Sequence, residues 1–129
     1  MNINYDSFLP DIETLIELQN KGALLNILID LHPADIEEIL NHLKKDQRQY
    51  LFNLLPTELA SDVLTELDTP LIDQILKNKS DDEISDLVEE MDSDDAADVI
   101  SELDEDVAQR VLEKMDIEEA DEVKQLLYH

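Results

Sequence analysis

The chain has 129 residues, with 34 Asp and Glu against nine Lys and Arg, and a formal net charge of −25. Apolar residues make up 43% of it, too many for a disordered acidic tail and enough for one domain with a core. The lack of cysteine excludes disulfides and thiolate metal sites, and the negative charge disfavours nucleic acid and direct membrane insertion. One glycine and no clean period-two alternation predict an all-α fold.

The N-terminal third carries the weakest pattern. Residues 1–10 are expected to form a flexible lead-in. They lack the basic and apolar regions of a signal peptide. Two helices are expected next, over residues 11–20 and 22–31, on either side of Gly22. The domain proper is therefore predicted to cover residues 11–129.

From His32 to Leu127 the chain divides without gaps into eight blocks of twelve residues. Block positions 5, 8, 9 and 12 are apolar except at Arg48, Lys79 and Lys124, and this spacing marks one face of an α-helix. Helices of this length are marginal alone, so neighbouring blocks must stack. The repeat predicts a solenoid of about ten short helices with 12-residue periodicity.

The first block position often holds a good N-cap residue: Asp68, Ser80, Asp92, Asp104 and Asp116. Ser80 with Glu83 and Asp116 with Glu119 have the spacing of a capping box.

Block positions 3 and 7 lie opposite the apolar stripe on the helical wheel, so their side chains are predicted to face outward. Asp94 and Asp98 occupy both positions in the sixth block, and Asp62 and Asp86 occupy position 7 in the third and fifth. The surrounding interval, residues 80–109, holds fourteen acidic residues and no Lys or Arg. Such a face is either a solvated surface or a surface that awaits a cation or a basic partner.

The acidic segment does not fit an EF-hand, because Ala96, Ala97 and Leu103 stand where the loop needs an oxygen ligand, Gly and Glu. A weak, largely hydrated Mg²⁺ site remains possible. His32, His42 and His129 are not spaced as metal ligands, and Lys44, Lys45 and Arg48 are expected to form a salt-bridging surface. No nucleophile motif or phosphate-binding glycine loop is present, so we do not expect an enzyme.

Three segments carry a family resemblance: LHPADIEEILNHL (31–43), LFNLLPTELASDVLTELD (51–68) and EEMDSDDAADVISELDED (89–106). In this order and spacing they resemble the cytosolic N-terminal domain of MgtE-type magnesium transporters and channels. The resemblance implies a right-handed superhelix that precedes a pair of CBS domains and a dimeric transmembrane pore. We therefore expect an excised, soluble domain from the cytoplasmic face of a cell-membrane transporter, without its CBS and transmembrane domains.

The resemblance also implies a function. Acidic faces of the N-terminal and CBS domains oppose each other, and Mg²⁺ between them screens the repulsion so that the pore closes. The motif acids correspond to Asp94, Asp98 and Asp62, with Asp86, Asp95, Glu90 and Glu102 as further contributors. The implied partners are the CBS domains and, through the parent transporter, a second copy.

A different class of function is an acidic helical scaffold that binds a basic partner, similar to the helical repeats of flagellar motor-switch proteins. The sequence that follows His129 in the parent gene distinguishes the two hypotheses: CBS-like segments favour the sensor, and a stop codon favours the scaffold.

Overall fold

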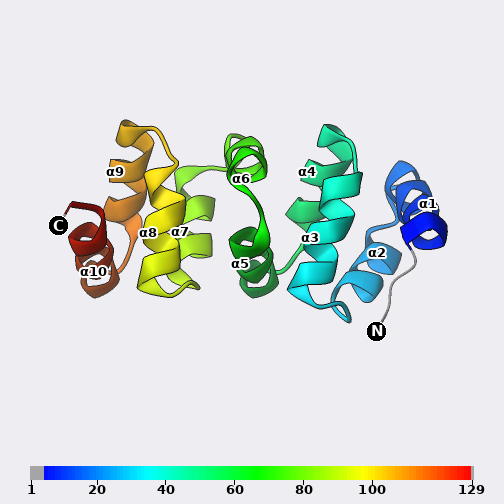
Figure 1. Ribbon diagram of the computed structural model, residues 1–129, viewed down its shortest axis with the longest axis horizontal. Helices are drawn as coiled ribbons and strands as arrows, with labels where there is room; N and C mark the ends of the chain where they lie inside the picture. The colour runs from blue at the N-terminus through cyan, green and yellow to red at the C-terminus, as the bar shows by residue number, and fades with distance from the viewer. Residues whose placement is uncertain (1–4, 129) are drawn as a thin grey trace. The chain divides into compact units, whose positions relative to one another are not determined.

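The computed structural model describes residues 5–128, and the described chain consists of ten α-helices without a strand (Figure 1). The all-α prediction is confirmed. The helices are α1 (Tyr5–Glu17), α2 (Lys21–Leu28), α3 (Pro33–His42), α4 (Lys45–Leu54), α5 (Thr57–Glu66), α6 (Thr69–Leu76), α7 (Asp81–Glu89), α8 (Ser93–Ser101), α9 (Glu105–Lys114) and α10 (Ile117–Tyr128). Over these residues, none of the helices combines the length and the apolar character that a bilayer crossing requires.

The twelve-residue repeat predicts the helix starts correctly. Each helix from α3 to α10 begins at the second residue of its block, from Pro33 in the first block to Ile117 in the last. The apolar block positions form the core, which includes fully buried Ile36, Leu64 and Val111. The repeat therefore encodes one helix and one corner per block.

The predicted caps are confirmed in part. Asp68 accepts a hydrogen bond from the Leu71 N–H at 3.3 Å, and Ser80 and Glu83 form the predicted capping box. Asp92 and Asp104 occupy the N-cap position, but their side chains make no capping bond within the described chain.

The capping box predicted for α10 is wrong. The Asp116 carboxylate accepts from the Glu118 N–H at 3.1 Å, but the Asp116 N–H donates to Glu89 of α7 at 3.0 Å, and not to Glu119. A carboxylate from a neighbouring helix thus takes the place of the local one, where the helix dipole favours negative charge.

The N-terminal prediction needs correction. Helix α1 begins at Tyr5 instead of residue 11, so the lead-in can cover at most residues 1–4, which lie outside the described residues. The chain reverses at Gln19, which has a left-handed φ of 54°, while the N–H groups of Gln19 and Asn20 bond to Ile16 and Leu15. These bonds form a Schellman motif, which usually contains glycine. Gly22 lies inside α2, and Asn20 caps that helix through the Ala23 N–H.

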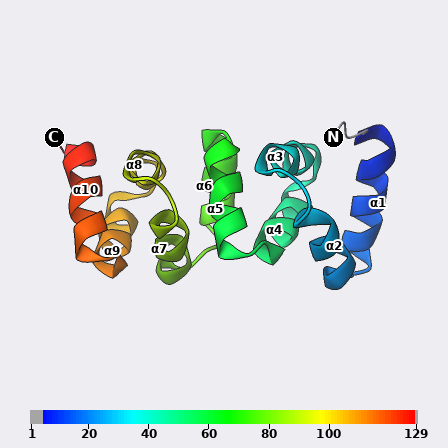
Figure 2. The same ribbon diagram turned by 90° about the horizontal axis from the view of Figure 1, so that it is seen from below.

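The chain divides into two compact units, with the boundary between Glu66 and Leu67. In the first unit α3 packs most extensively on α5; in the second, α7 packs on α9 and α8 on α10 (Figures 1 and 2). The closest packing thus joins helices two apart in sequence, as expected when two-helix hairpins stack.

Block position 6 is buried where its residue is small, although the repeat did not mark this position as apolar. Ser61, Ser85 and Ala97 are 1%, 3% and 6% exposed. Each lies on a helix that packs closely against a helix two further along the chain or two before it. Small side chains at this flanking position let two helix backbones approach, so the buried stripe is wider than the sequence indicates.

The exceptions to the apolar pattern have distinct explanations. Arg48 donates from its guanidinium to the carbonyl oxygens of Leu40 and Leu43, both at 2.9 Å, at the C-terminal end of α3, where the helix dipole favours a cation. The Lys79 side chain is mostly covered, at 12% exposed, and its ammonium pairs with Glu83 at 3.3 Å. Lys124 is exposed on α10.

Replacing Gly22 with alanine should stabilise the protein. Gly22 has no positive φ, and a Cβ at this position would meet no atom within 4 Å. The loss of backbone freedom in the unfolded chain should raise the free energy of unfolding by about 0.5–1 kcal/mol in urea titrations. Ala23→Gly, the reverse change at the next residue, should lower it; an unchanged or lower midpoint for Gly22→Ala would contradict the prediction.

Candidate metal site

Three carboxylates gather at the N-terminal end of α8. Asp92 precedes the helix, and Asp94 and Asp95 lie in its first turn; one oxygen from each lies within 4.8 Å of the others. Asp92 and Asp94 are exposed, and Asp95 is half-buried. The unpaired N–H groups at a helix start favour negative charge, so this end can hold the three acids together. We call these residues the α8 cluster.

The three predicted metal ligands, Asp94, Asp98 and Asp62, do not all belong to one cluster in the structure. Asp94 belongs to the α8 cluster, and Asp98 lies one turn further along the same helix, exposed and outside the cluster. Asp62 is exposed on α5 in the first unit and is not a cluster member. The three ligand assignments remain predictions.

The sequence pattern marks Asp92 as an N-cap residue and not as a metal ligand. Its side chain is available because it makes no capping bond within the described chain. The signal was present in the sequence, since the spacing Asp92, Asp94, Asp95 places acids on both sides of a helix start. Only the geometry shows that their oxygens converge.

The pKa of Asp95 reports the electrostatics of the cluster. Partial burial raises the pKa of the Asp95 carboxyl, and the charges of Asp94, Asp92 and Asp98 raise it further. Asp98 therefore acts on the cluster through its field, although its oxygens are not among the three that converge. A cation or a proton that arrived here would relieve this repulsion.

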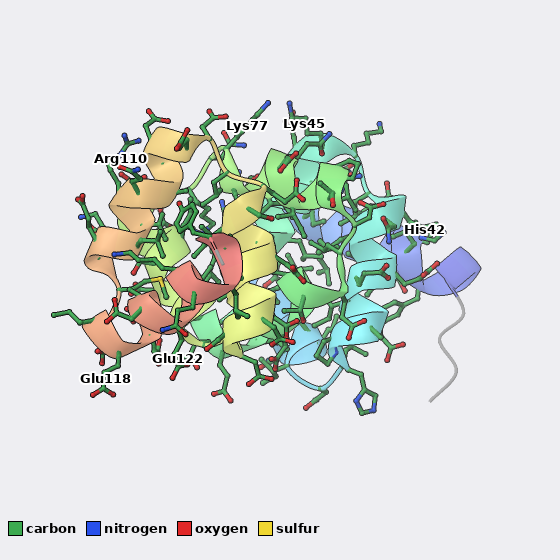
Figure 3. The ribbon with its side chains drawn as sticks, turned by 60° about the vertical axis from the view of Figure 1, so that its left-hand side comes forward. His42, Lys45, Lys77, Arg110, Glu118 and Glu122 are labelled. Carbon is green, nitrogen blue, oxygen red and sulfur yellow. The ribbon has the colours of Figure 1, made fainter. Side chains whose placement is uncertain are left out.

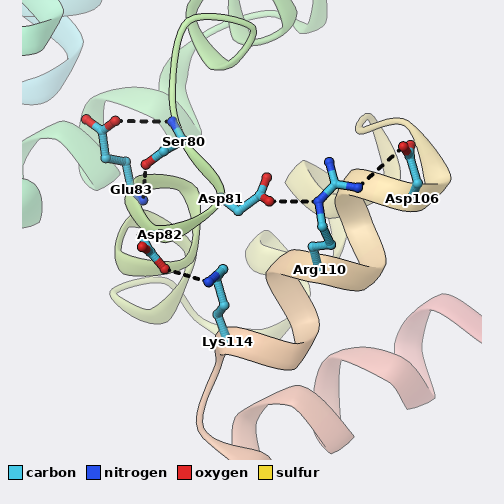
Figure 4. Close-up of polar contacts among 7 residues, drawn as sticks. All are labelled: Ser80, Asp81, Asp82, Glu83, Asp106, Arg110 and Lys114. Carbon is cyan, nitrogen blue, oxygen red and sulfur yellow. Dashed lines mark hydrogen bonds and ion pairs between the residues drawn. The ribbon is translucent and has the colours of Figure 1, made fainter.

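Neighbouring acids are neutralised by bases that come from outside the acidic interval. Arg110 of α9 binds Asp81 of α7 at 2.7 Å and Asp106 at 3.4 Å, and Lys114 binds Asp82 at 2.9 Å (Figure 4). These ion pairs connect the start of α7 to α9. The base-free interval of the sequence is thus partly neutralised in the fold.

The acids of α8 are not neutralised in this way. In residues 5–128, no Lys, Arg or His lies within ion-pair distance of Asp94, Asp95 or Asp98. The acids of α8 thus have no ion-pair partner within the described chain, and they lie on the segment whose outward positions the repeat marks.

The cluster offers only oxygen ligands on an open surface. Mg²⁺ keeps several water molecules and is commonly held by one or two carboxylates, so the α8 cluster fits a hydrated Mg²⁺ ion. Oxygen-only ligands disfavour zinc, which prefers imidazole and thiolate.

Two of the solved structures that match this chain share its fold. One, described as the soluble part of a magnesium transporter, matches with a TM-score of 0.83 and 21% identity over 97% of this chain and 50% of its own. The other, the cytosolic domain of the Mg²⁺ channel MgtE in complex with ATP, matches with a TM-score of 0.81 and 25% identity over 92% of this chain and 49% of its own. The present chain thus spans about half the length of either solved chain.

Residues 31–129 match the family described as the MgtE intracellular N domain. The chain belongs to this family. The match begins at Leu31, one residue before the first repeat block. It includes the three segments that carry the family resemblance. No curated protein sequence matches the chain.

Replacing Asp95 with asparagine should stabilise the protein at neutral pH. Because its pKa is raised in the folded state, the folded protein holds this proton more tightly than the unfolded chain. The cluster therefore costs stability above the folded pKa, and this cost disappears as the pH falls through the unfolded pKa. We expect Asp95→Asn to raise the free energy of unfolding by a few tenths of a kcal/mol near pH 7, as for other like-charge helix pairs.

Urea unfolding at about pH 7 and about pH 3 tests this sign, because carboxylates titrate between those values. Asp62→Asn, on a helix outside the cluster, provides the control and should change the stability less. If Asp95→Asn raised the free energy of unfolding by as much at about pH 3 as at about pH 7, charge repulsion would not be the cause of the stabilisation.

Proposed function

We propose that this chain is the regulatory Mg²⁺-sensing domain of a magnesium transporter or channel, at the cytosolic face of the membrane. Its acidic face docks on CBS domains of the parent chain when Mg²⁺ screens the repulsion, and the docked state closes the pore. Asp94, Asp98 and Asp62 are the proposed ligand residues. Asp92 and Asp95 complete the α8 cluster around Asp94.

The observation that carries this proposal is the unneutralised charge on α8 in a chain of the MgtE intracellular N domain family. Elsewhere in the second unit, Arg110 and Lys114 neutralise Asp81 and Asp82 at the start of α7. A surface required only for solubility would mix both signs along α8 as well. Three acids on α8, Asp94, Asp95 and Asp98, have no base of the described chain within ion-pair distance, and this favours a role for their repulsion.

The energies involved suit a two-state sensor. Two unit charges 4.8 Å apart repel by about 1 kcal/mol in a water-like dielectric and by more beside protein. Several such pairs across an interface would shift a docking equilibrium by a few kcal/mol, which is enough to change the dominant state. An exposed carboxylate site of this kind binds weakly, in the range where intracellular Mg²⁺ would vary its occupancy.

Each of the two copies of the parent transporter would carry one such domain. The proposed role is regulatory and not catalytic. Mg²⁺ is in this view the signal and, at the pore, the transported ion. The residues named here bind and release Mg²⁺. The resulting change in repulsion between the domains makes the state of the pore depend on the Mg²⁺ concentration.

Mg²⁺ titration of the isolated chain, followed by backbone amide shifts, tests the site. We expect saturable shifts at residues 92–98 that NaCl at matched ionic strength does not reproduce. Asp94→Asn with Asp98→Asn should reduce them, whereas Asp121→Asn with Glu113→Gln removes the same charge from exposed positions elsewhere in the second unit and should not.

Electrical recording of the full-length transporter tests the sensing role. The Asp94→Asn, Asp98→Asn pair should raise the Mg²⁺ concentration of half-closure by about tenfold, which corresponds to about 1.4 kcal/mol. The Asp121→Asn, Glu113→Gln pair should leave it within twofold. Gating that is unchanged by the α8 pair would overturn the proposal.

A further inference from the structure

A second feature of the C-terminal unit lies beside the α8 cluster. A hollow of about 190 Å³, open to solvent on one side, lies among the end of α7, the start of α8, the end of α9 and α10. This volume equals that of roughly six water molecules. It is too small for a helix and large enough for one long side chain.

The hollow has an apolar floor. Its floor is formed by Val88, Met91, Ala96, Met115 and Val123. Four of these residues are at most 6% exposed, and Met91 is half-buried, so the floor is part of the packed core. It offers dispersion contacts to a hydrocarbon chain but no ligand to a metal ion.

The rim is acidic. Asp92, Glu119 and Glu122 line the hollow with Ser93, whose hydroxyl donates to the Glu122 carboxylate at 2.6 Å. No Lys or Arg belongs to the lining. Within the described part of the chain, the Glu119 side chain takes part in no hydrogen bond or ion pair and is free to bind.

The charges around Glu119 favour the arrival of a cation. Partial burial raises the pKa of the Glu119 carboxyl, and the charges of Glu89, Asp116, Glu122 and Glu90 raise it further. Glu122, labelled with Glu118 in Figure 3, extends from α10 toward Ser93 of α8 through the bond described above. A positive group at the rim would therefore meet several carboxylates and no competing base.

We propose that this hollow binds one basic side chain, Lys or Arg, presented on the surface of a partner protein. Lys and Arg place a hydrocarbon stem on apolar surface and keep a charged head near polar groups, and the hollow has both parts in that order. Hydrated Mg²⁺ would gain nothing from the apolar floor, and a neutral apolar ligand would leave the rim carboxylates uncompensated. Charge complementarity therefore selects a basic partner.

This inference goes beyond Mg²⁺ sensing, since it concerns a different ligand and mainly different residues. Its failure would leave the α8 cluster unaffected, and loss of Mg²⁺ gating would not remove the hollow.

The methionines make the hollow accessible to a direct measurement. Met91 and Met115 line the hollow, so ¹³C-labelled methionine methyls give two reporters. The probe is N-acetyl-arginine amide, with N-acetyl-lysine amide in a second series. N-acetyl-citrulline amide, which has nearly the shape of the arginine probe without its charge, is the ligand control.

We expect saturable shifts of the Met91 and Met115 methyls with the arginine or the lysine probe, and a dissociation constant at least tenfold weaker with the citrulline probe. Glu119→Gln with Glu122→Gln should weaken binding of the basic probe at least tenfold. Asp121→Asn, on the same helix but outside the lining, should change it by less than twofold.

Three results would overturn the proposal. One is a shift that guanidinium chloride at matched ionic strength reproduces, since the stem would then contribute nothing. Another is binding that survives Glu119→Gln with Glu122→Gln. The third is a shift of both methyls that saturates with MgCl₂ and not with either basic probe, which would assign the hollow to a metal ion.

Discussion

The structure depends on the burial of one apolar stripe per helix. Helices of eight to thirteen residues are marginal in water, so each of the ten persists only because neighbouring helices cover its stripe. The apolar positions recur every twelve residues, and their register fixes where each helix begins. The same register fixes which residues cannot be buried, and in this chain most of those residues are acidic.

Some exposed acids of the second unit have ion-pair partners within the described chain and others have none. At the start of α7, two acids are paired with Arg110 and Lys114 from α9, and these pairs add to the contact between the two helices. Surface ion pairs of this kind contribute little stability each, so their larger effect is to lower the local charge density. On α8 no base of the described chain lies within ion-pair distance of the acids, and partial burial together with the charges of Asp94, Asp92 and Asp98 raises the pKa of Asp95. The charge on α8 is thus available to an ion or a partner, whereas Asp81 and Asp82 at the start of α7 are paired with bases.

The sequence predicts most of the fold and part of the candidate site. The repeat predicts each helix from α3 onward, because burial and helix start are both periodic. The N-terminal helices were misplaced because the reversal depends on Gln19 adopting a left-handed conformation, which composition does not reveal, and Gly22 was the more obvious break. Arg48 interrupts the apolar pattern because it binds two carbonyls at the C-terminal end of the preceding helix, α3. The sequence pattern does not reveal this contact.

The same limit applies to the candidate site. Outward positions were predicted from the helical wheel, and Asp94 and Asp98 are indeed exposed on α8. The wheel cannot describe a residue that precedes the helix, so it omitted Asp92, although its oxygen converges with those of Asp94 and Asp95. The hollow could not be predicted either, because its lining combines the ends of α7, α8 and α9 with α10, and no periodicity relates those residues.

Asp92 belongs to both the α8 cluster and the rim of the hollow, and this shared residue connects the two proposals. A cation held by the cluster would partly neutralise Asp92 and would repel a second positive charge at the rim. By thermodynamic linkage the effect is reciprocal, so a basic side chain in the hollow would weaken cation binding by the same factor. The two ligands would therefore compete without occupying the same space. A basic partner would be bound best when Mg²⁺ is scarce, the condition in which the proposed docking on CBS domains is weakest.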